Sequence, residues 1–278
     1  MVDSYILKLL SRYNFPGGMR PATVQDRREY YLNEFQVGKM KRWFDHWSSP
    51  VVFALVIGRH TRIFPKEHRN KFRDTIVIDE YRSFMDVLEW LLKYPPESVY
   101  YDRNIYTSWE QARTKQDVKD LGRKYGQEMA FDIDPENFTC PIHGSLEQKM
   151  ERHQGLSFCR LELQLARMQV LELYELLSRR FGDIQIVYSG RGFHLHVLDD
   201  KVLWWTRKKR LAYANSLIRK RFVMDEWVTA GGIRMIRLPY SLNSLVSRIA
   251  LPLKPSELES FDPLTDPRVI PSFLGGRA

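Results

Sequence analysis

The residues of this chain best suited to chemistry begin with two aspartates in the segment Met-Ala-Phe-Asp-Ile-Asp. Apolar and polar residues alternate here, and in a β-strand successive side chains point to opposite faces. Met129, Phe131 and Ile133 are therefore predicted to face the core, while Asp132 and Asp134 share the other face. Two such carboxylates can hold Mg²⁺ or Mn²⁺, and paired ions assist phosphoryl or nucleotidyl transfer. Alone the pattern is weak evidence, since most Asp-x-Asp pairs lie on solvated surfaces.

A second group of polar residues lies in a predicted β-hairpin. Residues 184–188 and 193–197 have strand patterns, and Ser-Gly-Arg-Gly at positions 189–192 forms the turn between them. A turn flanked by glycines lets backbone N–H groups approach an anion, and hydroxyl, guanidinium and imidazole groups add donors for phosphate oxygens. The predicted phosphate-binding residues are Ser189, Gly190, Arg191, Gly192 and His194. The alternative is an ordinary hairpin with two half-exposed histidines, His194 and His196.

A third group of polar residues spans positions 225–243. Asp225 stands two residues before Trp227 and is followed by Arg234 and Arg237. We interpret the two arginines as part of a helical turn, where residues three apart lie on one side, so that both can contact the same anion. The segment thus adds a third carboxylate and two cations to the candidate site.

Both cysteines and two of the seven histidines fall within a short stretch directly after the acidic strand. A Cys-x-x-His start is standard spacing for zinc, and four Cys and His ligands complete a tetrahedral site. The predicted ligands are Cys140, His143, His153 and Cys159, in an insertion over residues 138–160. Four protein ligands leave no open coordination position, so the zinc is predicted to be structural. The alternative is one buried and one free cysteine without metal.

Four motifs follow one another along the chain. They are Asp-Ile-Asp, then Ser-Gly-Arg-Gly-Phe-His-Leu-His-Val, then Met-Asp-Glu-Trp-Val-Thr, and then Arg-Met-Ile-Arg-Leu-Pro-Tyr-Ser-Leu-Asn. In this order they resemble the catalytic small subunit of archaeal and eukaryotic DNA primases, in the archaeo-eukaryotic primase superfamily. The resemblance is best over residues 100–271 and looser in the N-terminal third.

The resemblance implies that Asp132, Asp134 and Asp225 form a carboxylate triad that binds two metal ions, Mg²⁺ or Mn²⁺. It also implies that Ser189, Arg191 and His194 hold the phosphates of an incoming nucleotide, and that Arg237 lies near it. Zinc-binding knobs just after the acidic pair are common in this family. The implied fold is α+β, with a mixed or antiparallel central sheet, one half of it RRM-like, flanked by helices and carrying the zinc knob.

The chain departs from the family pattern over residues 241–248. The family usually has Ser-Leu-His followed by Lys-Thr-Gly, whereas this chain has Ser-Leu-Asn and then Ser-Leu-Val-Ser-Arg. Asn243 can still donate a hydrogen bond to phosphate, and Arg248 supplies the lost cation if the loop bends back. Both residues are therefore included in the predicted nucleotide site.

The function that these residues predict is template-dependent nucleotidyl transfer, in which a 3′-hydroxyl attacks the α-phosphate of a nucleoside triphosphate and short primers for DNA replication result. One alternative is a metal-dependent phosphodiester hydrolase that uses His194, His196 and the aspartates. Another is a non-catalytic nucleic-acid-binding relative, favoured by Asn243 but opposed by three carboxylates that would face a phosphate backbone. The implied partners are template DNA, nucleoside triphosphates and a primase large subunit in a heterodimer.

Apolar patterning predicts the elements that must position these side chains. Residues 51–57 form a continuous apolar run typical of a buried strand. Ser83 is placed to cap a helix that ends before Pro95. Apolar stripes over residues 160–181 and 202–221 predict two further helices that cover a sheet.

The 278 residues include 43 Lys and Arg against 34 Asp and Glu, a formal net charge of +9 that favours polyanionic partners such as nucleic acid. Basic clusters at 207–210 and 219–221 are either phosphate contacts or a solvated face. No apolar run approaches the roughly 18 residues that span a bilayer, and no signal-peptide pattern is present. We therefore expect no membrane partner and an intracellular location, in the cytoplasm or nucleoid. Without repeats or a linker, residues 1–278 are predicted to form one catalytic domain.

Overall fold

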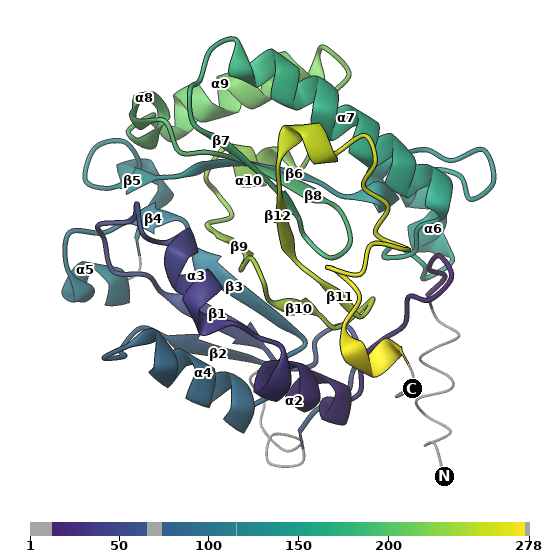
Figure 1. The fold of residues 1–278 in the computed structure, drawn as a ribbon. Coiled ribbons are helices and arrows are strands. Elements are labelled where there is room, and N and C mark those ends of the chain that lie inside the picture. Colours follow the sequence, from purple (N-terminus) through teal and green to yellow (C-terminus); the bar gives the residue numbers. More distant parts are fainter. Residues whose placement is uncertain (1–12, 66–73, 115, 276–278) are drawn as a thin grey trace.

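The computed structural model describes residues 13–65, 74–114 and 116–275, and within them antiparallel sheets form the centre of an α+β fold (Figure 1). One sheet contains β1 (Phe53–Val56), β2 (Thr75–Ile78), β3 (Ser98–Asp102) and β9 (Met235–Arg237), in the order β2-β1-β3-β9. The other contains β6 (Met129–Ile133), β7 (Ile184–Tyr188), β8 (Phe193–Val197) and β12 (Leu251–Leu253), in the order β12-β7-β8-β6. Two short pairs join β4 (Asn104–Ile105) to β5 (Gly126–Gln127) and β10 (Leu242–Asn243) to β11 (Arg248–Ile249).

Helices surround the two sheets. Those before the acidic strand are α2 (Val24–Asn33), α3 (Val37–Trp43), α4 (Phe84–Lys93) and α5 (Trp109–Arg113). Those after it are α6 (Leu146–Glu151), α7 (Arg160–Ser178), α8 (Asp200–Leu203), α9 (Arg207–Ile218) and α10 (Glu226–Thr229). Single 3₁₀ turns are η2 (Val118–Asp120), η3 (Pro135–Asn137), η4 (Pro255–Glu257) and η5 (Ser272–Leu274). Among the described residues, no helix combines the length and the apolar character needed to cross a bilayer.

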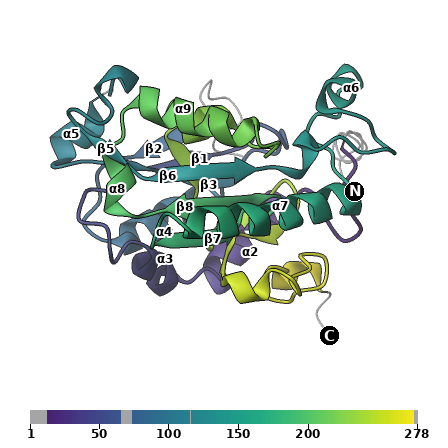
Figure 2. The same ribbon diagram turned by 90° about the horizontal axis from the view of Figure 1, so that it is seen from above.

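The two faces of the β6–β8–β7 sheet belong to two different hydrophobic cores. Phe131 and Leu195 point into the first core, which α7 and α9 cover (Figure 2). Ala130 and Val187, from the other face, join a second core that includes Tyr101 of β3. The inner face of this sheet is therefore turned toward the first sheet, and polar residues on it lie between the two sheets.

The local patterns form the elements they predict. The alternation in residues 129–133 gives strand β6, with Met129, Phe131 and Ile133 fully buried. The two strands of the predicted hairpin pair antiparallel as β7 and β8. Ser83 caps α4, where its hydroxyl accepts a hydrogen bond from the backbone N–H of Met85.

The predicted helix over residues 202–221 is wrong in one respect, because the structure divides it into α8 and α9. Thr206 interrupts the helix and caps α9 by accepting from the N–H of Lys209. Arg210 is fully buried, and its guanidinium donates to main-chain carbonyls that include those of Trp205 and Val202. Arg210 is therefore a structural residue and not a phosphate contact.

Candidate active site

The predicted acidic strand and the predicted hairpin are neighbours in one sheet. In the register of β6 and β8, Asp132 stands directly opposite His194, so both side chains lie on the inner face. The Oδ1 atom of Asp132 lies 3.3 Å from Nε2 of His194. Burial alone would raise the pKa of Asp132, but the imidazole of His194 and the guanidinium of Arg191 bring it below its ordinary value.

A cavity of about 180 Å³ on this inner face gathers most of the predicted site residues. Its carboxylates are Asp132, Asp134 and Asp225, and its other predicted members are Ser189, Arg191, His194, Arg237 and Asn243. Tyr100 of β3 and apolar side chains complete the wall. Strands of both sheets thus bring together residues that are more than 100 positions apart in the sequence.

Asp225 reaches the cavity because α10 packs against β6. Its backbone N–H donates to the carbonyl of Asp132 at 3.0 Å, and its carboxylate caps α10 by accepting from the N–H of Trp227 at 2.8 Å. Thr229 Oγ1 also donates to the carbonyl of Ala130 at 3.1 Å. These three contacts fix the third carboxylate beside the acidic strand. Burial and the charge of Asp132 raise the pKa of Asp225, against the opposing effect of the Trp227 N–H.

The turn between β7 and β8 depends on its glycines. Gly190 has a φ of +90°, and a Cβ there would lie 2.5 Å from Cβ of Asn243. A Cβ on Gly192 would lie 2.4 Å from the carbonyl oxygen of Ile133. Ser189 closes the turn, since its N–H donates to the carbonyl of Gly192 and its hydroxyl accepts from the Gly192 N–H. The turn therefore packs directly against the end of the acidic strand.

Arg191 connects the turn to two carboxylates. Its Nη2 lies 2.8 Å from Oδ2 of Asp134 and 2.7 Å from Oε1 of Glu136. Sequence patterns did not identify Glu136, because it lies in a 3₁₀ turn outside the strand alternation. Burial raises the pKa of Glu136 to about 8; Arg191 opposes this effect and Asp134 adds to it.

Three side chains of the cavity have a buried polar atom without a hydrogen-bond partner among the described residues: Arg237 at Nη1, His194 at Nδ1 and Asp132 at Oδ1. The other guanidinium nitrogen of Arg237 donates to the hydroxyls of Ser98 and Tyr100, and the group lies over the Tyr100 ring. Buried polar groups are nearly always paired, so unpaired ones beside a cavity point to a ligand that pairs them. An anion fits a guanidinium best.

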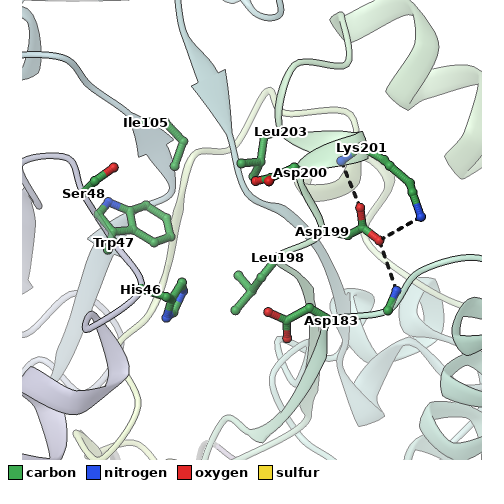
Figure 3. Close-up of a pocket in the computed structure, with 11 residues that line it drawn as sticks. His46, Trp47, Ser48, Ile105, Asp183, Leu198, Asp199, Asp200, Lys201 and Leu203 are labelled. Carbon is green, nitrogen blue, oxygen red and sulfur yellow. Dashed lines mark hydrogen bonds and ion pairs between the residues drawn. The ribbon is translucent and has the colours of Figure 1, made fainter.

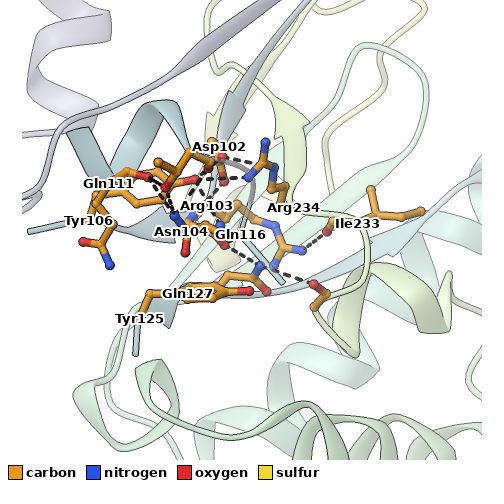
Figure 4. Close-up of polar contacts among 12 residues, drawn as sticks. Asp102, Arg103, Asn104, Tyr106, Gln111, Gln116, Tyr125, Gln127, Ile233 and Arg234 are labelled. Carbon is orange, nitrogen blue, oxygen red and sulfur yellow. Dashed lines mark hydrogen bonds and ion pairs between the residues drawn. The ribbon is translucent and has the colours of Figure 1, made fainter. Parts of the chain in front are cut away.

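The interpretation of Arg234 and Arg237 as one side of a helical turn is wrong. Arg237 belongs to strand β9, and residues three apart in an extended chain point to opposite faces. Arg234 instead forms an ion pair with Asp102, its Nε lying 3.3 Å from Oδ2, and contacts the hydroxyl of Tyr106 (Figure 4). Only Arg237 of the two lines the cavity.

Arg248 does not supply a cation to the cavity. Its side chain is buried, and its guanidinium donates to the carbonyls of Pro263, Gly18 and Ser247. Asn243 does line the cavity, although its amide nitrogen donates to the carbonyl of Ser189 at 3.3 Å. The β10–β11 pairing sets this arrangement, which no local sequence pattern shows.

The cluster after the acidic strand contains Cys140, His143, Cys159 and Glu162, whose ligand atoms all lie within 4.8 Å of one another. His153 is not part of this group; it is exposed, with a φ of +57°. Glu162, not predicted from sequence, takes the fourth place. Its carboxylate also accepts from the buried ammonium of Lys149 at 2.7 Å and from the N–H of Cys159 at 2.8 Å.

His196, the second histidine of the hairpin, does not reach the cavity. It is fully buried, and its Nδ1 is hydrogen-bonded to the carboxylate of Glu128. The hydroxyl of Tyr101 lies 3.3 Å from the same nitrogen, and the ring of Trp43 packs edge-on at 5.3 Å. This position opposes the interpretation in which both histidines bind a catalytic metal.

A larger cavity, of about 710 Å³, lies at the other end of the hairpin and contains none of the predicted residues. Figure 3 shows Trp47 on one side of it and Asp183, Asp199 and Asp200 on the other. Asp199 is already engaged, since it accepts from the N–H groups of Gly182 and Lys201. Its buried donor without a partner among the described residues is Nε1 of Trp47, an uncharged group, and its lining includes no arginine comparable to Arg191 and Arg237 between the sheets.

Comparison with known proteins gives a consistent set of relatives, although no protein-family model matches the chain. A protein of Archaeoglobus fulgidus described as "Uncharacterized DNA primase small subunit-like protein" is 45% identical over 269 residues, covering 95% of this chain and 94% of the relative. The DNA primase small subunit PriS of Thermococcus onnurineus is 25% identical and covers 80% of this chain, which spans 59% of that relative. Among solved structures, the polymerase domain of Mycobacterium tuberculosis ligase D in complex with DNA has a TM-score of 0.47 at 14% identity, covering 91% of this chain and 88% of that chain.

Proposed function

Because the chain belongs to the DNA primase small subunit-like family, we propose that it joins nucleotides from nucleoside triphosphates on a DNA template and so makes short primers for DNA replication. One observation supports this function most strongly. A single cavity holds three carboxylates together with buried cationic and imidazole groups that have free nitrogens. Carboxylates suit divalent cations and the free donors suit phosphate, which are the two requirements of nucleotidyl transfer.

Asp132, Asp134 and Asp225 would hold two Mg²⁺ or Mn²⁺ ions. The three residues offer only oxygen ligands, which these hard cations prefer. Their oxygens are not all within 4.8 Å of one another, unlike the ligand atoms of the cysteine cluster. Two ions about 3.5–4 Å apart need ligand oxygens that are farther from one another than a single ion does. When bound, the ions would stabilise the charge on the attacking and leaving oxygens. Strand β6 and the backbone contact from Asp225 to Asp132 hold the carboxylates in place beforehand.

The nucleotide's phosphates would lie against Ser189, His194, Arg237 and Asn243, with Arg191 at the edge of the glycine turn. Arg237 and His194 each contribute a buried nitrogen that has no hydrogen-bond partner in the part of the chain that the structure describes. Arg191 has five N–H donors, so it can remain paired with Glu136 and still address a phosphate oxygen. Gly190 and Gly192 keep the turn free of side chains that would collide with Asn243 and with the end of β6.

For the cluster after the acidic strand, we propose structural zinc held by Cys140, His143 and Cys159, with Glu162 as the nearest fourth ligand. The two sulfur atoms lie 3.8 Å apart, and Sγ of Cys140 lies 3.6 Å from Nδ1 of His143. These separations match the edges of a tetrahedron around one ion with bonds of about 2.0–2.3 Å.

The wider organisation of the protein is also a proposal. Residues 1–278 would form one catalytic domain, with residues 138–160 as a zinc-binding insertion. The chain spans about half to three fifths of the length of several PriS relatives that it matches. Those relatives are named small subunits, and we propose that this chain likewise assembles with a larger subunit.

Incubation with a single-stranded template, a labelled primer, nucleoside triphosphates and Mg²⁺ or Mn²⁺ tests the function. Nucleotidyl transfer predicts labelled products longer than the primer, formed only when template and triphosphates are both present. A phosphodiesterase would shorten the labelled strand without triphosphates, and a binding protein without catalytic activity would leave it unchanged. Either of these results would contradict the proposal.

A further inference from the structure

An exposed aromatic side chain stands beside the candidate active site. The side chain of Trp227 is 53% exposed, and the neighbouring Ile233 is 42% exposed. Tryptophan is highly buried on average, so a half-exposed tryptophan next to an exposed isoleucine marks a surface suited to contact with another molecule. The proposed nucleotide chemistry does not use this surface.

Contacts of the main chain place this surface at the mouth of the cavity on the Asp225 side. The N–H of Trp227 donates to the carboxylate of Asp225 at 2.8 Å. The N–H groups of Gly232 and Ile233 both donate to the carbonyl of Trp227, at 3.0 and 3.2 Å. Ile233 and Val228 also line the cavity itself. Trp227 and Ile233 therefore form one patch that adjoins the proposed metal-binding carboxylates.

The backbone under this patch is held by Arg103, whose side chain is fully buried. Its guanidinium donates to the carbonyl of Ile233 at 2.5 Å (Figure 4). It also donates to the carbonyls of Val228 at 2.8 Å and of Glu128, just before β6, at 2.7 Å. The segment that bears Trp227 is thus fixed to the sheet before any ligand arrives. A preorganised surface binds at a lower entropic cost than one that must be ordered.

Positive charge lies beside the exposed ring. The guanidinium of Arg207, at the start of α9, lies 5.9 Å from the centre of the Trp227 ring, and Lys208 next to it is exposed. α9 packs against α10, so Arg207 and the Trp227 ring belong to one surface. Aromatic faces for bases, together with cations for phosphates, are the combination by which proteins bind single-stranded nucleic acid.

We propose that Trp227 is a stacking platform for an unpaired base of the single-stranded DNA template as it enters the active site, with Arg207 contacting an adjacent phosphate. This inference rests on the proposed function and adds the route of the template to it. Every base has a π-face, so a platform of this kind accepts any sequence, as copying a template requires. The formal charge of +9 is consistent with a polyanionic occupant.

Fluorescence anisotropy of labelled single-stranded oligo(dT) tests the proposal with the full chain. Trp227→Ala is expected to raise the Kd for this DNA by about 5- to 100-fold, whereas Trp227→Phe, which keeps an aromatic face, changes it by less than about threefold. Trp204→Ala is the matched control, because Trp204 is 51% exposed at the end of α8 and does not line the cavity. It should bind as the wild type does.

The salt dependence of binding separates stacking from phosphate contact. Trp227→Ala should keep the wild-type slope of log K against log salt, while Arg207→Gln should reduce that slope by about one unit. Nucleotide binding without DNA should be the same in Trp227→Ala and the wild type. Unchanged nucleotide binding would show that Trp227 lies outside the nucleotide site. If the proposed function itself were wrong, the wild type would add no nucleotides, whatever the DNA affinity of Trp227→Ala.

Three outcomes would overturn the proposal. One is wild-type DNA affinity in Trp227→Ala. Another is a change in self-association of this variant by analytical ultracentrifugation with unchanged DNA affinity, which would identify the patch as a protein-contact surface. Because Trp227→Phe retains a ring in the same place, equal loss of DNA binding in Phe and Ala variants that both remain folded would also contradict stacking.

Discussion

At the scale of single residues, the geometry of the site depends on side chains that contact more than one ionisable neighbour. Arg191 shares one guanidinium nitrogen between Asp134 and Glu136. If Glu136 were absent, Asp134 would be the one carboxyl group among the described residues still in contact with Arg191, and it is also a proposed metal ligand. Glu136 is therefore a positioning residue, which acts on the nucleotide through Arg191.

Replacement of Glu136 tests this role. Glu136→Ala is expected to raise the KM for nucleotide about tenfold with a smaller change in kcat, an effect of about 1.4 kcal/mol. Glu136→Gln keeps an acceptor oxygen for Arg191, so its KM for nucleotide should rise less than that of Glu136→Ala. Steady-state kinetics measure both values. Glu257→Ala, which breaks the exposed ion pair with Arg268, is the control and should leave KM unchanged.

A second residue-scale prediction concerns the buried pair of His196 and Glu128, which is fully buried and also receives the hydroxyl of Tyr101. Burial lowers the pKa of His196, which favours the neutral imidazole, so removing Glu128 leaves buried groups without a hydrogen-bond acceptor, at a cost of about 1–3 kcal/mol. Glu128→Ala should lower the free energy of unfolding in urea by about this amount. A loss below about 1 kcal/mol would show that His196 does not depend on Glu128.

At the scale of elements, the hairpin turn is required by geometry as well as by chemistry. Gly190→Ala should reduce stability by about 1–3 kcal/mol, since a positive φ and a clash with Asn243 act together. It should weaken nucleotide binding as well, because Asn243 and Ser189 line the cavity. Gly182→Ala, near the start of β7 with open space around its Cβ position, is the control and should change neither quantity. Denaturation and nucleotide titration measure the two effects.

The cysteine cluster gives a prediction for another element, the segment between η3 and α7. Purified wild-type protein is expected to contain about one zinc ion per chain, and Cys140→Ser or Cys159→Ser should lose it. His153→Ala should retain zinc, because His153 lies outside the cluster. Metal analysis by mass spectrometry distinguishes these cases. Zinc-free wild type, or zinc loss in His153→Ala alone, would contradict the proposed ligand set.

Elements with strong local patterns could be predicted from the sequence. The alternation around Asp132, the glycine turn after β7 and the cap at Ser83 each depend on neighbours within a few residues. Pairing between distant segments does not depend on such near neighbours and therefore leaves no local pattern. Strand β9 contains three residues, too few for a clear period, so the position of Arg237 against β3 could not be distinguished from a helical turn.

At the scale of the whole molecule, the candidate site exists because two sheets face one another. Asp132 and His194 come from one sheet, while Tyr100 and Arg237 come from the other. The sequence identified most of the cavity's polar residues by type, but it could not show that Arg248 and Arg210 are internal. Each of these arginines bonds to carbonyls from segments far away in the sequence, such as those of Gly18 and Gln127.

The most direct measurement of the central claim is the rate of nucleotide addition on a primed template by the wild type and by Asp132→Asn, Asp134→Asn and Asp225→Asn. The control is Asp200→Asn, whose carboxylate lines the larger cavity at the other end of the hairpin. If the three aspartates of the cavity hold the catalytic metal ions, each of their variants should lower kcat by at least about a hundredfold, or ~3 kcal/mol, and the control should keep the wild-type rate. Wild-type rates in the three cavity variants, or an equal loss in Asp200→Asn, would contradict the claim.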